Sequence, residues 1–234
     1  MFRGGLTPAY LFVIQGSQTN RLLYTMEKKS PDLHGNAPDN SPIALLLIDV
    51  INDFEFDEGA VELFRHALPA AQKIAALKSR AVGADVPAIY VNDNFGKWRS
   101  DFRNLVAHCI DDDTRGRPIA ELLKPNQDDY FVLKPKQSGF YSTTLDLLLQ
   151  HLGARTLILT GFATDICVLL TASDAHLRDY NLLIPRDCVA AQNEPENERA
   201  LEYMQRVLQA EIASSDKIDL TKTKRGFATT RSGR

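Results

Sequence analysis

Short apolar runs alternate with longer amphipathic segments along most of this chain, and this alternation restricts the fold more than any other feature. The first run, at residues 44–50, is apolar throughout except for Asp49. Such a run is typical of a strand that is buried on both faces of a parallel sheet. Residues 60–81 then repeat apolar side chains at the spacing of an amphipathic helix. This order predicts a parallel sheet with helices on both faces.

The alternation continues to residue 209 and indicates one domain over residues 42–215. Further strands are predicted at residues 87–92, 130–133, 156–160 and 182–185. Helices are predicted at residues 144–152, 167–179 and 196–209, and a loop or short helix follows the second strand. Residues 1–41 lack periodicity, so we expect a largely irregular extension there. Residues 216–234 are predicted to form a basic tail.

Composition narrows the classes of partner and the cellular compartment. The chain has 234 residues and a formal net charge of −3, which gives no electrostatic reason to expect nucleic acid or an anionic membrane. No apolar stretch approaches the roughly 18–20 residues of a membrane span. The 3 cysteines are far apart in the sequence and match neither a disulfide framework nor a zinc site. A reducing, cytoplasmic setting is therefore the expectation.

Three chemically useful side chains fall at or just beyond the ends of predicted strands. Asp49 ends the first strand, Lys134 ends the third, and Cys167 follows the fourth. In open α/β sheets, ligands bind beyond the carboxyl ends of the strands, so these groups are expected at one edge. Lys136 competes with Lys134 for the basic role. No histidine falls at a strand end, which argues against a Cys–His pair.

Each of these residues alone also fits a structural role. Asp49 could cap a loop, and Lys134 could be a surface lysine that buries its aliphatic stem. Cys167 is expected to open a helix, where the helix dipole favours the thiolate and unpaired N–H groups can hold an oxyanion. A free cysteine packed as a small hydrophobe fits that segment equally well, and the buried role is expected for Cys109 and Cys188.

Three segments together resemble the motifs of the isochorismatase-like cysteine hydrolase superfamily. They lie at residues 45–54, 132–140 and 160–168, in the order found in that superfamily. The resemblance implies a three-layer α/β/α, Rossmann-like fold around a six-stranded, mainly parallel sheet. It implies a catalytic triad of Asp49, Lys134 and Cys167, and a homodimer or homotetramer. It also implies a cis peptide between Phe162 and Ala163, and an oxyanion hole built from backbone N–H groups of Ala163, Thr164 and Cys167.

Two departures within the superfamily indicate the reaction. Isochorismatases proper typically lack the cysteine, so Cys167 favours hydrolysis of a C–N bond in a small amide, carbamoyl or ureido compound. Nicotinamidases carry a histidine-rich metal site after the second strand, whereas residues 90–98 contain no histidine. We therefore expect no metal or other cofactor, since backbone N–H groups can stabilise an oxyanion.

The substrate pocket is predicted to include Phe54, Asn94, Trp98 and Phe140. Core packing is an equally good interpretation for Phe140. Two alternative functions stay open at this point. One is a vinyl-ether hydrolase of the isochorismatase type, which would need Asp49 without a nucleophilic thiol. The other is a non-catalytic scaffold that retains the fold. The residues alone do not name the substrate.

Overall fold

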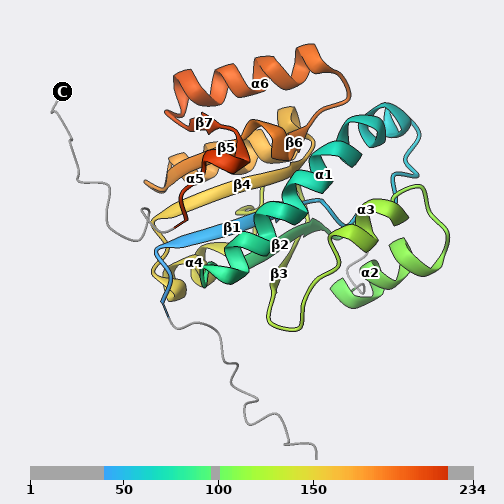
Figure 1. Cartoon of the computed structure of the whole chain (residues 1–234), viewed down its shortest axis with the longest axis horizontal. Coiled ribbons are helices and arrows are strands. Elements are labelled where there is room, and N and C mark those ends of the chain that lie inside the picture. The colour runs from blue at the N-terminus through green and yellow to red at the C-terminus, as the bar shows by residue number, and fades with distance from the viewer. Residues whose placement is uncertain (1–39, 96–100, 221–234) are drawn as a thin grey trace, which may run out of the picture. The chain divides into compact units, whose positions relative to one another are not determined.

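The computed structural model describes residues 40–95 and 101–220, which form a parallel sheet with helices on both faces (Figure 1). The strands are β1 (Ile43–Ile48), β2 (Ala88–Asp93), β3 (Tyr130–Lys134), β4 (Thr156–Phe162), β5 (Asn181–Pro185), β6 (Val189–Ala190) and β7 (Glu211–Ala213). The sheet order is β3-β2-β1-β4-β5-β7, with β6 paired to β4. All of these pairings are parallel, which confirms the predicted fold class.

The sheet in the described residues has 7 strands rather than the 6 expected. The sequence pattern itself located five of these strands, and the count of six came from the resemblance. The two strands that the pattern missed are β6 and β7, which contain 2 and 3 residues. Segments this short are below the usual length of a strand and cannot display a repeating pattern. Both depend on a neighbouring strand for their definition, since β6 pairs with the end of β4 and β7 pairs with β5.

Helices cover both faces of the sheet. They are α1 (Ala60–Gly83), α2 (Phe102–Asp111), α3 (Arg117–Leu122), α4 (Leu145–Leu152), α5 (Leu169–His176) and α6 (Glu194–Val207). One core layer packs the sheet against α1, α2 and α3, and the other packs it against α4, α5 and α6. Among the described residues, no helix is long and apolar enough to cross a membrane.

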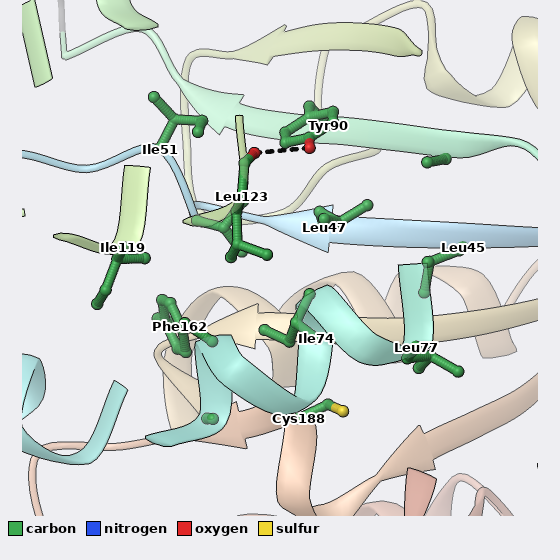
Figure 2. Packing of buried hydrophobic residues seen from close by; sticks show 14 of the residues in the cluster. Leu45, Leu47, Ile51, Ile74, Leu77, Tyr90, Ile119, Leu123, Phe162 and Cys188 are labelled. Atoms are coloured by element: carbon green, nitrogen blue, oxygen red, sulfur yellow. Dashed lines mark hydrogen bonds between the residues drawn. The ribbon is translucent and has the colours of Figure 1, made fainter. Parts of the chain in front are cut away.

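Strand β1 shows how the sequence pattern produces these two layers. All 6 of its side chains are buried, because both faces of the strand are covered. Leu45 and Leu47 point into the first layer, and Leu46 and Ile48 point into the second. Figure 2 shows Leu47 facing Ile74 of α1 and Leu45 facing Leu77 of the same helix. The strict alternation follows from the two-residue period of a strand.

Two predicted boundaries move in the structure. The segment expected to be one helix from Cys167 is a π-helical turn, Thr164–Val168, followed by α5. Cys167 therefore lies inside this turn instead of opening an α-helix. At the C-terminal end, Ile218 and Leu220 are buried in the first core layer. The packed domain thus continues past the expected boundary at residue 215, because these two side chains of the predicted tail belong to the core.

Candidate active site

The ends of β1, β3 and the turn after β4 bring Asp49, Lys134 and Cys167 together. Lys134 ends β3 and its side chain is 0% exposed. Its Nζ atom lies 2.8 Å from Oδ2 of Asp49 and 3.6 Å from Sγ of Cys167. Burial of a lysine is costly unless its charge is paired, so this ammonium group is fixed by its neighbours. Lys136, the competing candidate, is exposed.

Asp49 is held in place by the backbone of β2. Its own N–H donates to the carbonyl of Val91 at 3.0 Å, and its Oδ1 accepts from the N–H of Asp93 at 2.7 Å. Asp49 has a φ of 50°, in the left-handed region that non-glycine residues rarely adopt. Such a conformation persists where the surroundings enforce it, and here it aims the carboxylate at Lys134.

Burial and charge together set the protonation of the three groups. Burial raises the pKa of Asp49, and the opposing effects of Lys134 and the Cys167 thiol do not cancel this rise. Burial works to lower the pKa of Lys134, but the charges of Asp49, Cys167 and Asp93 outweigh it and raise that pKa. Lys134 therefore remains a cation. The arrangement pairs one ammonium group with a carboxyl group and a thiol.

The expectation that the helix dipole favours the Cys167 thiolate is wrong for this structure. Burial and the nearby Asp49 charge raise the pKa of Cys167, although Lys134 opposes them. The thiol is thus protonated at rest. Its hydrogen-bonding contact with the Asp49 carboxyl group provides a route for the proton to leave. Deprotonation by a base replaces permanent ionisation as the way to form the nucleophile.

The turn that carries Cys167 depends on a glycine and on a close backbone approach. Gly161 has a φ of +118°, and a Cβ there would lie 1.9 Å from the carbonyl oxygen of Ile48. The peptide bond between Phe162 and Ala163 is cis. Thr164 is fully buried and donates through Oγ1 to Oδ1 of Asn197 at 2.6 Å, which ties the turn to α6. These contacts leave little freedom to the backbone before Cys167.

Two of the predicted oxyanion donors, Ala163 and Thr164, lie at the start of this turn, and Cys167 lies further along it. The Ala163 carbonyl accepts from the N–H groups of Ile166 and Val168, at 3.2 and 3.1 Å. Ala163 precedes the turn, and Thr164 is its first residue. N–H groups at the start of a helical segment lack the carbonyl partners that later residues have. The use of Ala163, Thr164 and Cys167 as oxyanion donors stays a prediction.

The predicted pocket residues divide into three cases. Phe54 is 0% exposed and packs on Phe162, so it belongs to the hydrophobic core. Phe140 is also buried and lies under the guanidinium of Arg178, 4.7 Å from its ring centre, which agrees with its packing interpretation. Asn94 is buried at the carboxyl edge, next to the end of β2. Trp98 lies outside the described residues.

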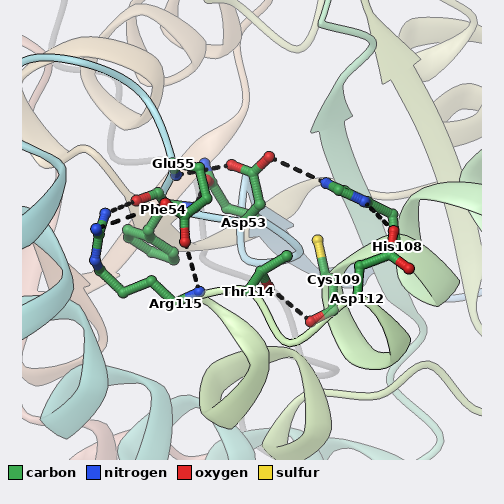
Figure 3. A network of polar contacts seen from close by, with 9 residues as sticks. Asp53, Phe54, Glu55, His108, Cys109, Asp112, Thr114 and Arg115 are labelled. Carbon is green, nitrogen blue, oxygen red and sulfur yellow. Dashed lines mark hydrogen bonds and ion pairs between the residues drawn. The ribbon is translucent and has the colours of Figure 1, made fainter.

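A polar network that the sequence analysis missed supports the loop after β1 (Figure 3). His108 of α2 lies between two carboxylates, 3.2 Å from Oδ2 of Asp53 and 2.7 Å from Oδ2 of Asp112. We call these three residues the His108 clasp. Hydrogen bonds that the His108 ring donates to the carboxylates of Asp112 and Asp53 raise the pKa of His108. The clasp fastens α2 to the loop that begins with Asp49, and no spacing in the sequence indicates it.

The second motif is also joined directly to α5, the helix that follows the third motif. Ser138 donates to Oδ2 of Asp174 at 2.5 Å, and the N–H of Gly139 donates to Oγ1 of Thr171 at 3.0 Å. These bonds connect the loop after β3, which follows Lys134, with α5, which follows Cys167.

Among the described residues, no group of three or more His, Cys, Asp or Glu side chains is arranged to hold a metal ion.

Asp93 is a further residue that the sequence analysis did not assign to the site. It ends β2, and its Oδ2 lies 3.6 Å from Nζ of Lys134. Its side chain is 35% exposed, compared with 9% for Asp49. The sequence feature that could have indicated Asp93 is its position at a strand end, because a carboxylate there borders the ligand-binding edge of the sheet.

The fold and this cluster define a class of three-layer α/β protein with Asp, Lys and Cys at the carboxyl edge of a parallel sheet. Residues 43–217 match the family model for the isochorismatase domain, and the chain belongs to the isochorismatase family. Members of this family are hydrolases, and they include amidases that act on C–N bonds.

Several individual proteins are similar to this chain. The uncharacterized isochorismatase family protein YaaI of Bacillus subtilis is 42% identical over 175 residues, which cover 75% of this chain and 95% of YaaI. The ureidoacrylate amidohydrolase RutB of Methylorubrum extorquens is 44% identical over 62 residues, 26% of this chain and 25% of RutB. N-carbamoylsarcosine amidase from Thermoplasma acidophilum matches in structure with a TM-score of 0.61 and 28% identity, covering 76% of this chain and 99% of that protein.

Proposed function

We propose that the chain is a cysteine hydrolase that cleaves a C–N bond in a small amide, carbamoyl or ureido compound through a thioester on Cys167. The observation that carries this proposal is the contact of Cys167 with both other groups. Its half-buried thiol lies 3.6 Å from the Lys134 ammonium and in hydrogen-bonding contact with Asp49. A nucleophile beside a base that is itself oriented by a third group is the arrangement that covalent catalysis requires.

The chemistry follows from the positions of these groups. Asp49 accepts the thiol proton as Sγ attacks the substrate carbonyl carbon, and the carbonyl oxygen becomes the oxyanion. Backbone N–H groups at the turn of Ala163, Thr164 and Cys167 stabilise that charge. The C–N bond then breaks while Asp49 returns the proton to the departing nitrogen.

Water completes the reaction by attacking the thioester. Asp49 takes a proton from this water, the C–S bond breaks, and the thiol is restored. A raised pKa suits Asp49 to both steps, because it makes the carboxylate a stronger base toward the thiol and lets the same group return the proton as an acid. Lys134 keeps the carboxylate in place and limits the energetic cost of its charge.

The relatives support the bond type. Two of the similar proteins carry names that describe amide-type hydrolysis, namely ureidoacrylate amidohydrolase and N-carbamoylsarcosine amidase. The match to RutB is confined to 62 residues, and the match to the amidase has 28% identity. These similarities favour cleavage of a C–N bond over cleavage of a vinyl ether. They do not identify the substrate.

A direct test combines turnover with trapping of the intermediate. Wild type, Cys167→Ala and Cys167→Ser are assayed for ammonia release from a panel of small amides and ureido acids. We expect the variants to lose at least about a thousandfold in kcat, because the nucleophile is removed. Intact-protein mass spectrometry of acid-quenched wild type is expected to show an acyl group on Cys167.

Cys188→Ala is the matched control, because it removes a thiol that is 0% exposed and lies in the core layer under α1. It is expected to keep its turnover and its acyl adduct. Continued hydrolysis by Cys167→Ala at the wild-type rate would contradict a thioester route. If that variant cleaved a vinyl ether while Asp49→Asn did not, the alternative hydrolase reaction would replace the proposal.

A further inference from the structure

Asp93 and Cys167 are the two groups around the Lys134 ammonium that solvent can reach. Asp93 is 35% exposed in its side chain and Cys167 is half-buried, whereas Lys134 is 0% and Asp49 is 9% exposed. A molecule that approaches Sγ from solvent therefore meets the Asp93 carboxylate in the same region. Nothing in the proposed acid–base steps uses Asp93.

The distances allow one small substrate to contact both groups. Oδ2 of Asp93 and Sγ of Cys167 each lie 3.6 Å from the same Nζ atom, so they are at most twice that distance apart. A carbonyl carbon poised for attack lies about 3–3.5 Å from the nucleophile. A nitrogen bonded to that carbon is about 1.3 Å further, and its N–H···O bond adds about 2.9 Å. A bent path of these contacts is long enough to bridge the two groups, so a nitrogen next to the scissile carbonyl can reach Asp93.

The Asp93 carboxylate is oriented, and within residues 40–95 and 101–220 its Oδ2 has no donor at normal hydrogen-bond distance. Its Oδ1 accepts from the N–H of Phe95 at 2.6 Å, which fixes the rotation of the group. Its Oδ2 is 3.6 Å from Lys134, beyond normal hydrogen-bond distance. An ionised carboxylate oxygen accepts and cannot donate, so Oδ2 selects for an N–H and against a carboxylate at that position.

The balance of charge points in the same direction. The Lys134 ammonium faces two carboxyl groups, Asp49 and Asp93, while the Cys167 thiol is neutral at rest. The local charge is therefore negative when both carboxyl groups are ionised. A neutral substrate rich in N–H donors is favoured over one with a carboxylate next to its carbonyl.

We propose that Asp93 is a specificity-determining residue that accepts a hydrogen bond from the retained nitrogen of a ureido or carbamoyl substrate. This inference rests on the proposed function. A carbonyl flanked by two nitrogens matches two carboxylates, since Asp49 serves the departing nitrogen and Asp93 holds the other. The Sγ–C bond forms as the bond to the departing nitrogen breaks, the proton passes through Asp49 to ammonia, and a thiocarbamate remains for water to cleave.

The test compares an alkyl urea with the carboxamide in which CH₂ replaces the retained NH. Wild type is expected to prefer the urea by at least about tenfold in kcat/KM, because a hydrogen bond to a charged group is lost with the carboxamide. In Asp93→Asn, an amide that keeps its bond to Phe95 presents NH₂ to the substrate. We expect kcat/KM for the urea to fall about 10- to 100-fold, with the carboxamide changed less than about threefold.

Asp53→Asn is the matched control. Asp53 also accepts through Oδ1 from the N–H two residues later, at 3.0 Å, but it contacts His108 instead of Lys134. This control is expected to leave the urea-to-carboxamide ratio unchanged. A urea that is N-methylated on its retained nitrogen gives the same test with unaltered protein, and wild type is expected to cleave it about tenfold less well.

The outcomes separate the two proposals. An equal loss for both compounds in Asp93→Asn, with Cys167 still required, would overturn the Asp93 assignment and show that Asp93 acts only through Lys134. Wild-type preference for the carboxamide would overturn it as well. Hydrolysis that persists in Cys167→Ala would instead overturn the proposed cysteine mechanism, whatever the ratio.

Discussion

Cys167 and Cys188 follow neighbouring parallel strands, yet their surroundings differ completely. Cys167 lies in the turn after β4, half-buried and in contact with Asp49 and Lys134. Cys188 ends the short 3₁₀ turn after β5 and is 0% exposed in the core beside α1 (Figure 2). Burial and the charge of Asp187 raise the pKa of Cys188 to about 12.

The carboxylates near the two thiols also make different contacts. Asp187 accepts from both the N–H and the Oγ of Ser215, each at 2.7 Å, so it is occupied in fastening the chain after β7. Asp49 faces the ammonium of Lys134 and the thiol of Cys167. A cysteine at a strand end therefore becomes a candidate nucleophile only where other strand ends bring a base and a cation to an accessible thiol.

The largest expected effect comes from removing the cation at the Cys167 end. Lys134→Met leaves the buried Asp49 without its partner, and breaking such a pair costs about 3–5 kcal/mol. The pKa of Asp49, already raised by burial, is expected to rise further, so the loss of stability grows as the pH rises. Turnover is expected to fall at least about a hundredfold. Urea unfolding at several pH values and steady-state kinetics measure both effects.

Lys136→Met is the control for this prediction, because Lys136 is exposed and two residues away. It is expected to change stability by less than about 0.5 kcal/mol. The double variant Lys134→Met/Asp49→Asn is expected to recover stability without activity, since no unpaired charge remains buried. Equal effects of Lys134→Met and Lys136→Met would contradict the special role given to the lysine at the end of β3.

The second prediction concerns thiol reactivity. Because the Asp49 charge raises the pKa of Cys167, Asp49→Asn is expected to lower that pKa and to speed alkylation by iodoacetamide about tenfold near neutral pH. Turnover is expected to be lost, since the base is gone. Rates are followed by mass spectrometry across pH.

Cys109 and Cys188 provide internal controls in the same experiment. Burial raises the pKa of each to about 12, and each is 0% exposed. Neither is expected to react in the folded protein. An alkylation rate at Cys167 that does not respond to Asp49→Asn would show that the two groups are not coupled.

The third prediction concerns the buried cysteine, Cys188. Cys188→Ala removes a buried sulfur from the core, so we expect a loss of about 1 kcal/mol in the free energy of unfolding. Turnover is expected to stay within about twofold of wild type. A large loss of activity with little loss of stability would give Cys188 a role that its burial does not suggest.

The smallest expected effect lies in the His108 clasp, which supports the loop that starts at Asp49. The raised folded pKa of His108 means that its stabilisation is present below the unfolded value of about 6.5 and is lost as pH rises through the folded pKa. The side chain is 46% exposed, so solvent screens the interaction. We expect His108→Gln to cost less than about 1 kcal/mol at pH 6 and almost nothing at pH 9.

Urea unfolding of wild type and His108→Gln at both pH values checks this prediction. Asp53 and Asp112 are the acidic partners on either side of the ring, so the change in attraction between the two pH values comes from the imidazole. A stability difference between the two proteins that grows as the pH rises would contradict the expected sign of this pH dependence.

The sequence pattern predicted the frame of the fold because local signals were strong. Runs such as β1 are apolar on both faces, and Gly153 ends α4 with a left-handed φ of 67°, as its position predicts. After β2 the sequence pattern left a loop or a short helix open, and the structure has α2 there, whereas α3, β6 and β7 were not predicted. They are short, and their packing against the sheet decides their form.

The site was predictable in its members and not in its electrostatics. The order of strand ends indicated that Asp49, Lys134 and Cys167 would meet, and the structure brings them within a few ångströms of one another. The expected thiolate was wrong, because burial and the charge of Asp49 raise the pKa of Cys167. Phe54 was expected in the pocket, but its side chain is 0% exposed and belongs to the first core layer.

By itself, the sequence determined the alternation of strands and helices and the three residue types that close the strands, because these follow from local periodicity and from the direction of parallel strands. Only the tertiary structure decided which lysine is buried, which cysteine is accessible, that Asp93 lies near the buried lysine, and that the His108 clasp joins α2 to the loop after β1. Those properties depend on distances between residues far apart in the chain, and on the low polarity of the space they share.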